Sequence, residues 1–251
     1  IDEVVVVDDP VVDEPIVDEP TRSVSFALGP LASGINANIS DVTVDDGSNL
    51  IGFIDPSVNG LVYNIGTAVN RNTGFDPSSG LRWGRWADGI ATQSGADGSS
   101  NNIDLTNQGL HWITSAEADI PVQQITGSQG YQLVGNTDPS DNLGNIGVLG
   151  SATFSADFTN NSVQSSLALS INQSVWNASG SGTITSNLFS GLYGTVTVNG
   201  EVNGSGSFGG IFAGFGDGSA LPLGAGLNYQ LTNGTTTVSG AAVFNSPQQN
   251  K

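Results

Sequence analysis

The sequence contains no cysteine and no methionine, few basic residues and no long apolar run. Without cysteine it has neither a disulfide nor a thiolate metal site. Its basic residues are Arg22, Arg71, Arg82, Arg85 and Lys251, against 23 acidic residues, and the formal net charge is −18. Such a chain cannot neutralise a phosphate backbone, so we expect no nucleic-acid binding and no attraction to an anionic membrane surface. Because no apolar run approaches the roughly 20 residues of a membrane-spanning helix, we also expect no membrane insertion.

The composition also bears on where the protein is found. Charged residues make up only 11% of the chain, whereas about a quarter is usual in globular proteins. Glycine, asparagine, serine and threonine are abundant instead. We therefore expect a secreted or cell-surface protein. The chain begins with Ile1 rather than methionine, which predicts a processed product or a fragment from which any signal peptide has been removed.

The first 20 residues form an acidic repeat. Its five-residue units end at Pro10, Pro15 and Pro20, and the segment carries eight carboxylates and no basic residue. Proline at every fifth position excludes a helix, because each proline removes an N–H group and clashes with the preceding turn. Like charges then extend the chain. Residues 10–20 are thus predicted to be an extended tether, which would reach about 34 Å in the polyproline II conformation.

The beginning of this arm differs from the tether, because it is apolar and free of proline. Its apolar residues are Ile1, Val4, Val5, Val6 and Val7. Four consecutive β-branched residues suit a strand that is buried on both faces. This favours a strand, residues 1–9, that is donated to the sheet edge of a neighbouring subunit, and head-to-tail repetition of that contact would build a filament. The alternative is a linker or a tether to a membrane anchor, in which the valines have no partner.

After Thr21 the pattern becomes that of β-strands. Ala152, Phe154, Ala156 and Phe158 alternate with polar residues, and the alternation resumes over residues 163–171 after a polar turn. This predicts a β-hairpin with one buried face. Asn-Gly pairs predict tight type I′ hairpin turns; they lie at 59–60, 199–200, 203–204 and 233–234.

Two further patterns complete the prediction of the fold. Between residues 204 and 218 glycine occupies nearly every second position, which indicates bends, bulges or close backbone approach, as at barrel corners. In the first half we expect strands separated by long polar loops, at 24–28, 39–44, 50–54, 61–65 and 110–113, with a flexible insertion at 93–108. We therefore predict an all-β protein, in which a single antiparallel β-barrel or barrel-like sandwich spans residues 21–246. The extended N-terminal arm of residues 1–20 precedes it, and a tail of residues 247–251 follows.

Several segments carry a family resemblance. They are residues 131–144, the hairpin beginning at 151–158, Trp83-Gly-Arg-Trp86, His111-Trp112, 209–214 and 226–229. Together they resemble the C-terminal β-domain of bacterial FecR-domain-containing proteins. The last two segments are also similar to the small barrels of transferrin-binding-protein-like surface lipoproteins. The resemblance implies an envelope or exported location and a barrel-like fold, and it implies no catalytic residues. The chain has no FecR domain before the acidic arm, which argues against a signalling role.

The rare aromatic and basic residues are candidates for ligand binding. Trp83 and Trp86 flank Arg85, and their spacing places the two indoles on opposite faces of a strand, one in the core and one exposed to stack on a sugar or another subunit. The alternative is a core tryptophan with the arginine bound to the acidic surface. His111, the sole histidine, lies beside Trp112 and could ligate a haem iron. A structural histidine at a strand end is its alternative role.

Catalytic and metal-binding motifs are sparse. With one histidine, no G-x-S-x-G elbow and no carboxylate pair selected by spacing, we expect no enzyme. Calcium is a candidate ligand, because acidic residues with Asn, Ser and Gly neighbours cluster on loops. The candidates are Asp45, Asp46, Asp97, Asp104, Asp138 and Asp141. None fits the EF-hand spacing, and Asp and Asn are also ordinary turn residues.

Two functional hypotheses follow. The first is a non-enzymatic, exported bacterial structural protein without a cofactor, which self-assembles into an extracellular filament by donating its N-terminal arm. The second is a cell-surface β-barrel module that binds haem, a glycan or a protein and is tethered by the acidic arm.

Overall fold

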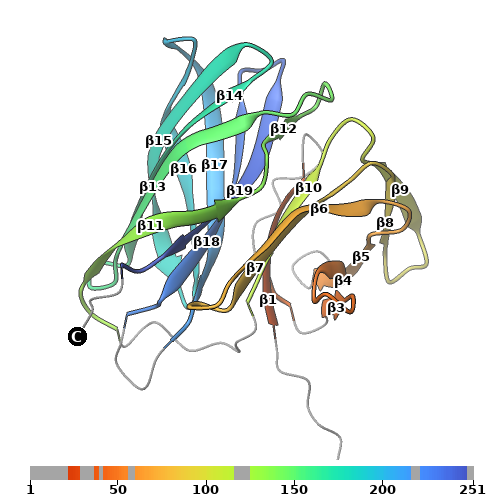
Figure 1. The fold of residues 1–251 in the computed structure, drawn as a ribbon, viewed down its shortest axis with the longest axis horizontal. Helices are drawn as coiled ribbons and strands as arrows, with labels where there is room; N and C mark the ends of the chain where they lie inside the picture. The colour runs from red at the N-terminus through yellow and green to blue at the C-terminus, as the bar shows by residue number, and fades with distance from the viewer. Residues whose placement is uncertain are drawn as a thin grey trace, which may run out of the picture.

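The computed structural model describes residues 22–28, 37–39, 42–55, 60–115, 125–215 and 221–247. The arm, including the predicted donated strand of Ile1 and residues 4–7, lies outside the described residues. Within them the chain forms 19 strands and no helix, which confirms the all-β prediction. The strands build a nine-stranded sheet and two five-stranded sheets, and every pairing between them is antiparallel (Figure 1).

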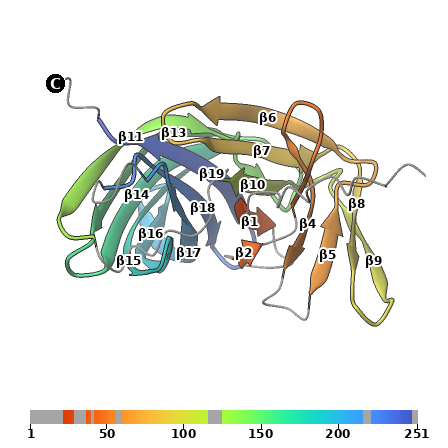
Figure 2. The ribbon, with the colours of Figure 1, turned by 90° about the horizontal axis from the view of Figure 1, so that it is seen from below.

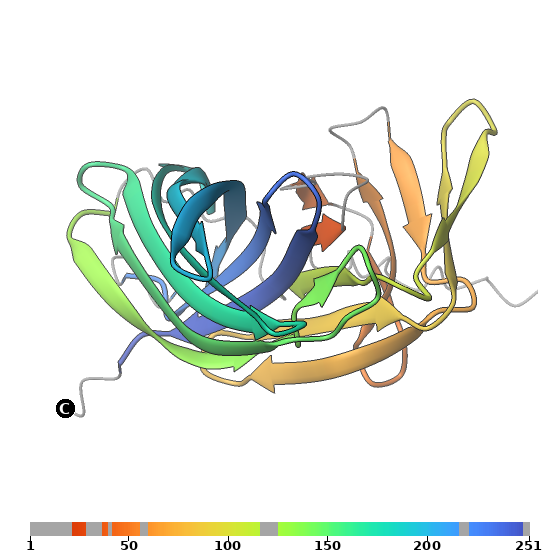
Figure 3. The same cartoon turned by 90° about the horizontal axis from the view of Figure 1, so that it is seen from above.

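A closed eight-stranded barrel occupies the second half of the chain. Its strands are β11 (Ser128–Asn136), β13 (Val148–Asp157), β14 (Ser162–Ile171), β15 (Ser174–Thr185), β16 (Leu188–Val198), β17 (Glu201–Ala213), β18 (Gly224–Thr232) and β19 (Thr237–Asn245). From β13 each strand pairs with the next, and β11 pairs with both β13 and β19, which closes the barrel (Figure 3). The short β12 (Ser140–Asp141) pairs with the beginning of β19, at Val238 and Ser239. The predicted barrel is thus confirmed.

Aromatic side chains fill the barrel. In β13 to β16 the inward-facing residues alternate with mostly polar, outward-facing ones, as the pleat requires. β18 and β19 are buried on both faces, because the inner sheet covers them. Phe154 and Phe189 have ring centroids 4.7 Å apart, and those of Phe189 and Phe212 are 5.0 Å apart. All three rings are at most 2% exposed. The interior is a packed core rather than an open ligand chamber.

The first half of the chain forms two stacked sheets beside the barrel instead of further barrel strands. The inner sheet has the order β2 (Ala37–Ile39), β1 (Arg22–Leu28), β10 (Leu110–Thr114), β7 (Leu81–Ala87), β6 (Val69–Asp76). The outer sheet has the order β3 (Val42–Val44), β4 (Leu50–Asp55), β5 (Leu61–Asn64), β8 (Ile90–Ser94), β9 (Ser100–Asp104). Figure 2 shows the inner sheet between the barrel and the outer sheet, and β1 and β10 contact β18 and β19 of the barrel wall.

Two apolar cores hold these layers together. One lies between the two sheets and includes Phe53, Trp86 and Trp112. The other joins the inner sheet to the barrel wall and includes Trp83 and Ile113 against Val243. The inner sheet therefore buries both faces, which explains why β7 and β10 are buried along nearly their whole length.

Several local predictions for the first half are wrong. The expected flexible insertion at 93–108 is mostly the β8–β9 hairpin and its following turn. The expected strand at 39–44 is two strands in different sheets, β2 and β3. The edge strand β6 lies in a stretch that the sequence predicts to be a polar loop. In the structure most of its side chains are exposed.

The Asn-Gly predictions have mixed outcomes. At Asn199 and Gly200 φ is 54° and 88°, as a type I′ turn between β16 and β17 requires. Asn203 and Gly204 instead lie within β17, opposite an irregularity in β16. The close backbone approach predicted for the glycine-rich segment is confirmed in this strand, because a Cβ on Gly210 would collide with the carbonyl oxygen of Gly226.

Candidate functional site

The described tryptophans are all buried. Trp83 is 9% exposed, and Trp86, Trp112 and Trp176 are at most 1% exposed. Trp83 and Trp86 do lie on opposite faces of β7, as their spacing predicts, but both faces of that strand are covered. The prediction of an exposed indole for stacking is therefore wrong. Trp83 packs between Gly74 of β6 and Gly135 of β11, where a Cβ on either glycine would collide with the indole.

His111 joins the inner sheet to the barrel. It is fully buried, with Nδ1 2.6 Å from the hydroxyl of Thr137 and Nε2 2.9 Å from the hydroxyl of Ser140. Thr137 Oγ1 also accepts a hydrogen bond from the backbone N–H of Ala241. With both ring nitrogens bonded inside the protein, His111 has no free atom for a haem iron, and the haem prediction is wrong. No sequence pattern indicates the roles of Thr137 and Ser140, which lie 26 and 29 residues away.

Burial holds the pKa of His111 well below its usual range, and the positive charge of Arg85 adds to this effect. The folded protein therefore keeps His111 neutral, whereas the unfolded chain takes up a proton as the pH falls through about 6.5. Proton uptake by the unfolded state alone favours unfolding, so this contribution to stability is present above that pH and is lost below it.

We expect the free energy of unfolding to fall by about 1 kcal/mol between about pH 7 and about pH 5.5, because of His111. Urea titrations across this range would measure it. Since the chain has no other histidine, the His111→Gln variant should lack this decrease. An equal pH dependence in both proteins would show that His111 is not the group responsible.

Four of the six aspartates predicted to bind calcium accept hydrogen bonds from backbone N–H groups of their own turns, whereas Asp138 accepts one from Asn72 of β6. Asp45 accepts hydrogen bonds from the backbone N–H groups of Gly47 and Asn49, and Asp97 from that of Ser99. The pKa of both carboxyl groups is lowered, chiefly by hydrogen bonds from the side chains of Asn49 and Ser99 and further by these backbone bonds. Asp104 accepts in the same way from Thr106, and Asp141 from Leu143 and Asn145. Asp46 lies on the exposed turn before β4. Within the part of the chain that the structure describes, no three His, Cys, Asp or Glu residues are grouped to hold a metal ion.

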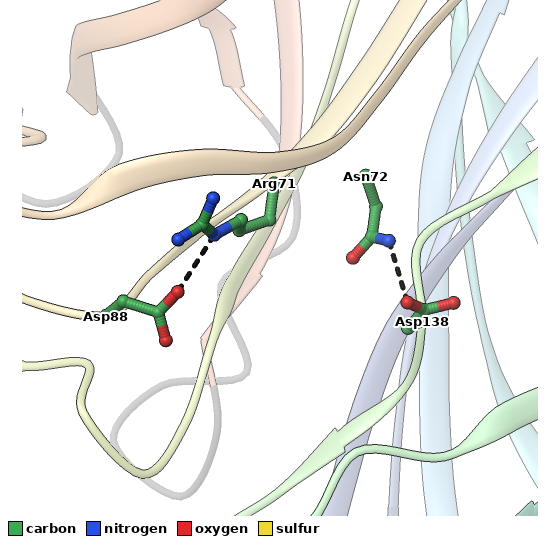
Figure 4. Close-up of polar contacts among 4 residues, drawn as sticks. All are labelled: Arg71, Asn72, Asp88 and Asp138. Atoms are coloured by element: carbon green, nitrogen blue, oxygen red, sulfur yellow. Dashed lines mark hydrogen bonds and ion pairs between the residues drawn. The ribbon is translucent and has the colours of Figure 1, made fainter.

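Arg85 is the most unusual polar residue of the junction between barrel and inner sheet. It is 7% exposed, and its Nε and Nη1 atoms are buried without a hydrogen-bond partner among the described residues. In the sheet it is paired across the strands with Arg71 on one side and His111 on the other. Arg71 forms an exposed ion pair with Asp88, at 2.9 Å. Asn72 donates a hydrogen bond of 2.7 Å to Asp138, which ties β6 to the barrel (Figure 4).

Neither the family models nor the curated proteins that were compared match this chain. The resemblance to FecR-domain-associated and transferrin-binding-protein-like barrels therefore remains a prediction. In the described part of the chain, no helix is long and apolar enough to cross a membrane.

The structure brings only some of the predicted residues together. Arg85 and His111 are neighbours in one row of the inner sheet, and Asp138 lies close to that row. Trp86 and Trp112 belong to the core between the sheets, on the other face. Among the predicted ligand-binding residues, Arg85 thus marks the candidate site, at the junction of the inner sheet and the barrel.

Proposed function

We propose that this protein is a non-enzymatic, exported protein that self-associates by adding its N-terminal arm to an open sheet edge of a neighbouring copy. The observation that carries the proposal is the contrast between the barrel and the two sheets. The barrel is closed by the β11–β19 pairing, whereas the inner sheet has open edges at β2 and β6 and the outer sheet at β3 and β9. An open edge presents unpaired backbone groups to which an extended segment can add.

Charge favours β6 as the acceptor. Arg71 lies on β6, and Arg82 of the adjacent β7 stacks over the ring of Phe75 at 4.2 Å. The Arg71–Asp88 ion pair is more than half exposed on both sides, so it holds Arg71 only weakly. Of the other open edges, β9 has Asp97 and Asp104 at its ends, and β2 and β3 carry no basic residue. An arm with eight carboxylates and no basic residue is attracted to β6 and repelled by β9.

The side chains of β6 suit an apolar donated segment. Phe75 is 46% exposed and Val69 is 39% exposed. Four consecutive valines in the arm would cover such side chains while the acidic residues around them approach the arginines. This is the pattern of strand addition, in which main-chain bonds supply affinity and side-chain contacts supply specificity.

We expect the full chain to form polymers in sedimentation and negative-stain electron microscopy, and a variant lacking residues 1–9 to remain monomeric. Phe75→Glu, which places a negative charge on the acceptor edge, should weaken assembly. Ile90→Glu is the matched control, because Ile90 is 41% exposed but lies on β8 of the outer sheet. Unchanged polymers after removal of residues 1–9 would contradict arm donation, and equal effects of the two glutamate variants would contradict β6 as the acceptor.

The second candidate is a surface module that binds a protein ligand. A shallow depression of about 560 Å³ lies over β15 and β16 on the outer wall of the barrel, and its lining includes Gly180, Gly191 and Leu192. Leu192 is 70% exposed and would be the apolar contact for such a partner. Monomers of the full chain at every concentration would favour this function over self-assembly.

A further inference from the structure

We propose that Arg85 and Ser140 form a binding site for a carboxylate group at the junction of the inner sheet and the barrel. The site is a pocket of about 100 Å³ between three segments: the end of β7, the β9–β10 connection, and the turn that follows β12. Its lining includes Arg85, Asp88, Asn107, Gln108, Ser140 and Asn145. No residue of β6 lines this pocket, and binding of a small carboxylate there can be measured whether or not the protein assembles.

The guanidinium of Arg85 is the reason to expect an anion. A buried arginine without a hydrogen-bonded partner is costly, because the desolvated charge is not compensated. Within the described residues Nε and Nη1 have none, and the nearest carboxylates are otherwise engaged: Asp88 binds Arg71, and Asp138 accepts from Asn72. An anion in the pocket would supply the missing partner.

The protein backbone makes room for this arginine. A Cβ on Gly109 would lie 2.6 Å from Cδ of Arg85 and 3.0 Å from the hydroxyl oxygen of Ser140. Glycine at this position therefore lets the arginine stem and the serine lie side by side. We infer that the absence of a side chain at Gly109 allows Arg85 and Ser140 to line the pocket together.

His111 orients the hydroxyl of Ser140 toward the same pocket. Thr137 Oγ1 accepts the N–H of Ala241, and we assign its own proton to a hydrogen bond donated to Nδ1 of His111. The neutral imidazole then carries its proton on Nε2 and donates it to Ser140 Oγ. Ser140 keeps its own proton for a ligand, so the pocket offers a hydroxyl donor beside the guanidinium.

The surrounding charges favour a carboxylate over phosphate or sulfate. Asp88 lines the pocket, and Asp138 acts on Arg85 electrostatically. These two negative charges oppose a dianion more strongly than a monoanion. A carboxylate is also planar and matches the planar fork of a guanidinium. It can come from a free small molecule or from an aspartate or glutamate side chain, such as those of the arm.

The test uses the full chain and the Nε–H signals of arginine in a ¹H–¹⁵N spectrum, which are few because the chain has four arginines. Sodium formate is the probe, with sodium chloride and sodium sulfate as ionic-strength controls. We expect one signal to shift and saturate with formate. Nuclear Overhauser contacts between this Nε–H proton and the Gly109 protons should assign it to Arg85. Ser140→Ala should weaken formate binding about tenfold, as loss of one hydrogen bond to a charged group implies. Ser166→Ala, on β14 and outside the pocket lining, is the matched control and should leave binding unchanged.

Removal of residues 1–20 distinguishes the two sources of the carboxylate. If the arm supplies it, the Arg85 signal of the full chain already lies at its bound position, and the truncated protein shows the free position until formate is added. If a free carboxylate is the ligand, both proteins start at the free position and respond equally to formate. An Arg85 signal that formate shifts no more than chloride does, in both proteins, would overturn the proposal. This readout on the unmutated residue also avoids reliance on an Arg85 variant that fails to fold.

Discussion

Replacing Trp83 with alanine is expected to lower the free energy of unfolding by about 3–5 kcal/mol, which is the usual cost of removing a buried tryptophan. The indole is 9% exposed and fills the space between Gly74 of the inner sheet and Gly135 of the barrel. Neither glycine has a side chain that could move into the cavity. Because the same core joins the sheets to the barrel, the two parts should also unfold less cooperatively in the variant.

Urea unfolding followed by tryptophan fluorescence would measure both effects. Trp176 belongs to the barrel core, whereas Trp86 and Trp112 belong to the core between the sheets. Trp176→Phe leaves reporters only on sheet strands. Phenylalanine at Trp86 and Trp112 leaves Trp176 as the barrel reporter, together with Trp83 in the proteins that retain it. The two midpoints should coincide while Trp83 is present and should separate once the Trp83→Ala substitution is introduced. Phe75→Ala, at a position 46% exposed, is the control and should cost less than about 1 kcal/mol. A similarly small cost for Trp83→Ala would contradict the role of this core.

The barrel could be predicted from sequence because its strands obey a simple rule. The strands β13 to β16 each have one buried and one solvated face, so Phe154, Ala156 and Phe158 alternate with polar residues. From β13 to β19, neighbouring strands are also neighbours in the sequence, so local turns such as Asn199-Gly200 indicate the pairing. The pattern and the pairing are both local.

The two sheets obey no such rule. The inner sheet is covered on both faces, so β7 shows no alternation, and the polar edge strand β6 has little apolar pattern. β1 pairs with β10, whose residues follow more than 80 positions later. Pairings at such separation depend on packing in the complete fold, which a local pattern does not contain.

The candidate site was only partly predictable for the same reason. In the sequence Arg85 stands out as a rare basic residue beside two tryptophans. Its burial results from the barrel segment that covers β7 and β10. Ser140 and Thr137 resemble ordinary turn residues in the sequence, and only the fold brings their hydroxyls to His111. Residue rarity therefore indicated the location, and tertiary packing determined the chemistry.

Replacing Phe212 with alanine should have an effect as large as that at Trp83, again about 3–5 kcal/mol. Phe212 is 1% exposed, and the centroid of its ring lies 5.0 Å from that of Phe189 and 5.1 Å from that of Phe158. Tyr131 and Phe154 also pack against it. Thermal and urea unfolding would measure the loss. Leu192→Ala is the matched control, because Leu192 lies on the same barrel but is 70% exposed.

The Phe212→Ala variant also tests whether the lumen is a rigid, dry core. A cavity lined by aromatic rings within a closed sheet cannot collapse easily, so it should stay empty of water and bind a small apolar molecule. We therefore expect benzene to raise the melting temperature of the variant and to leave that of the wild-type protein unchanged, because the wild-type lumen is filled. Stabilisation of both proteins by benzene would indicate a lumen that already admits ligands. Stabilisation of neither would indicate that the barrel contracts around the missing ring.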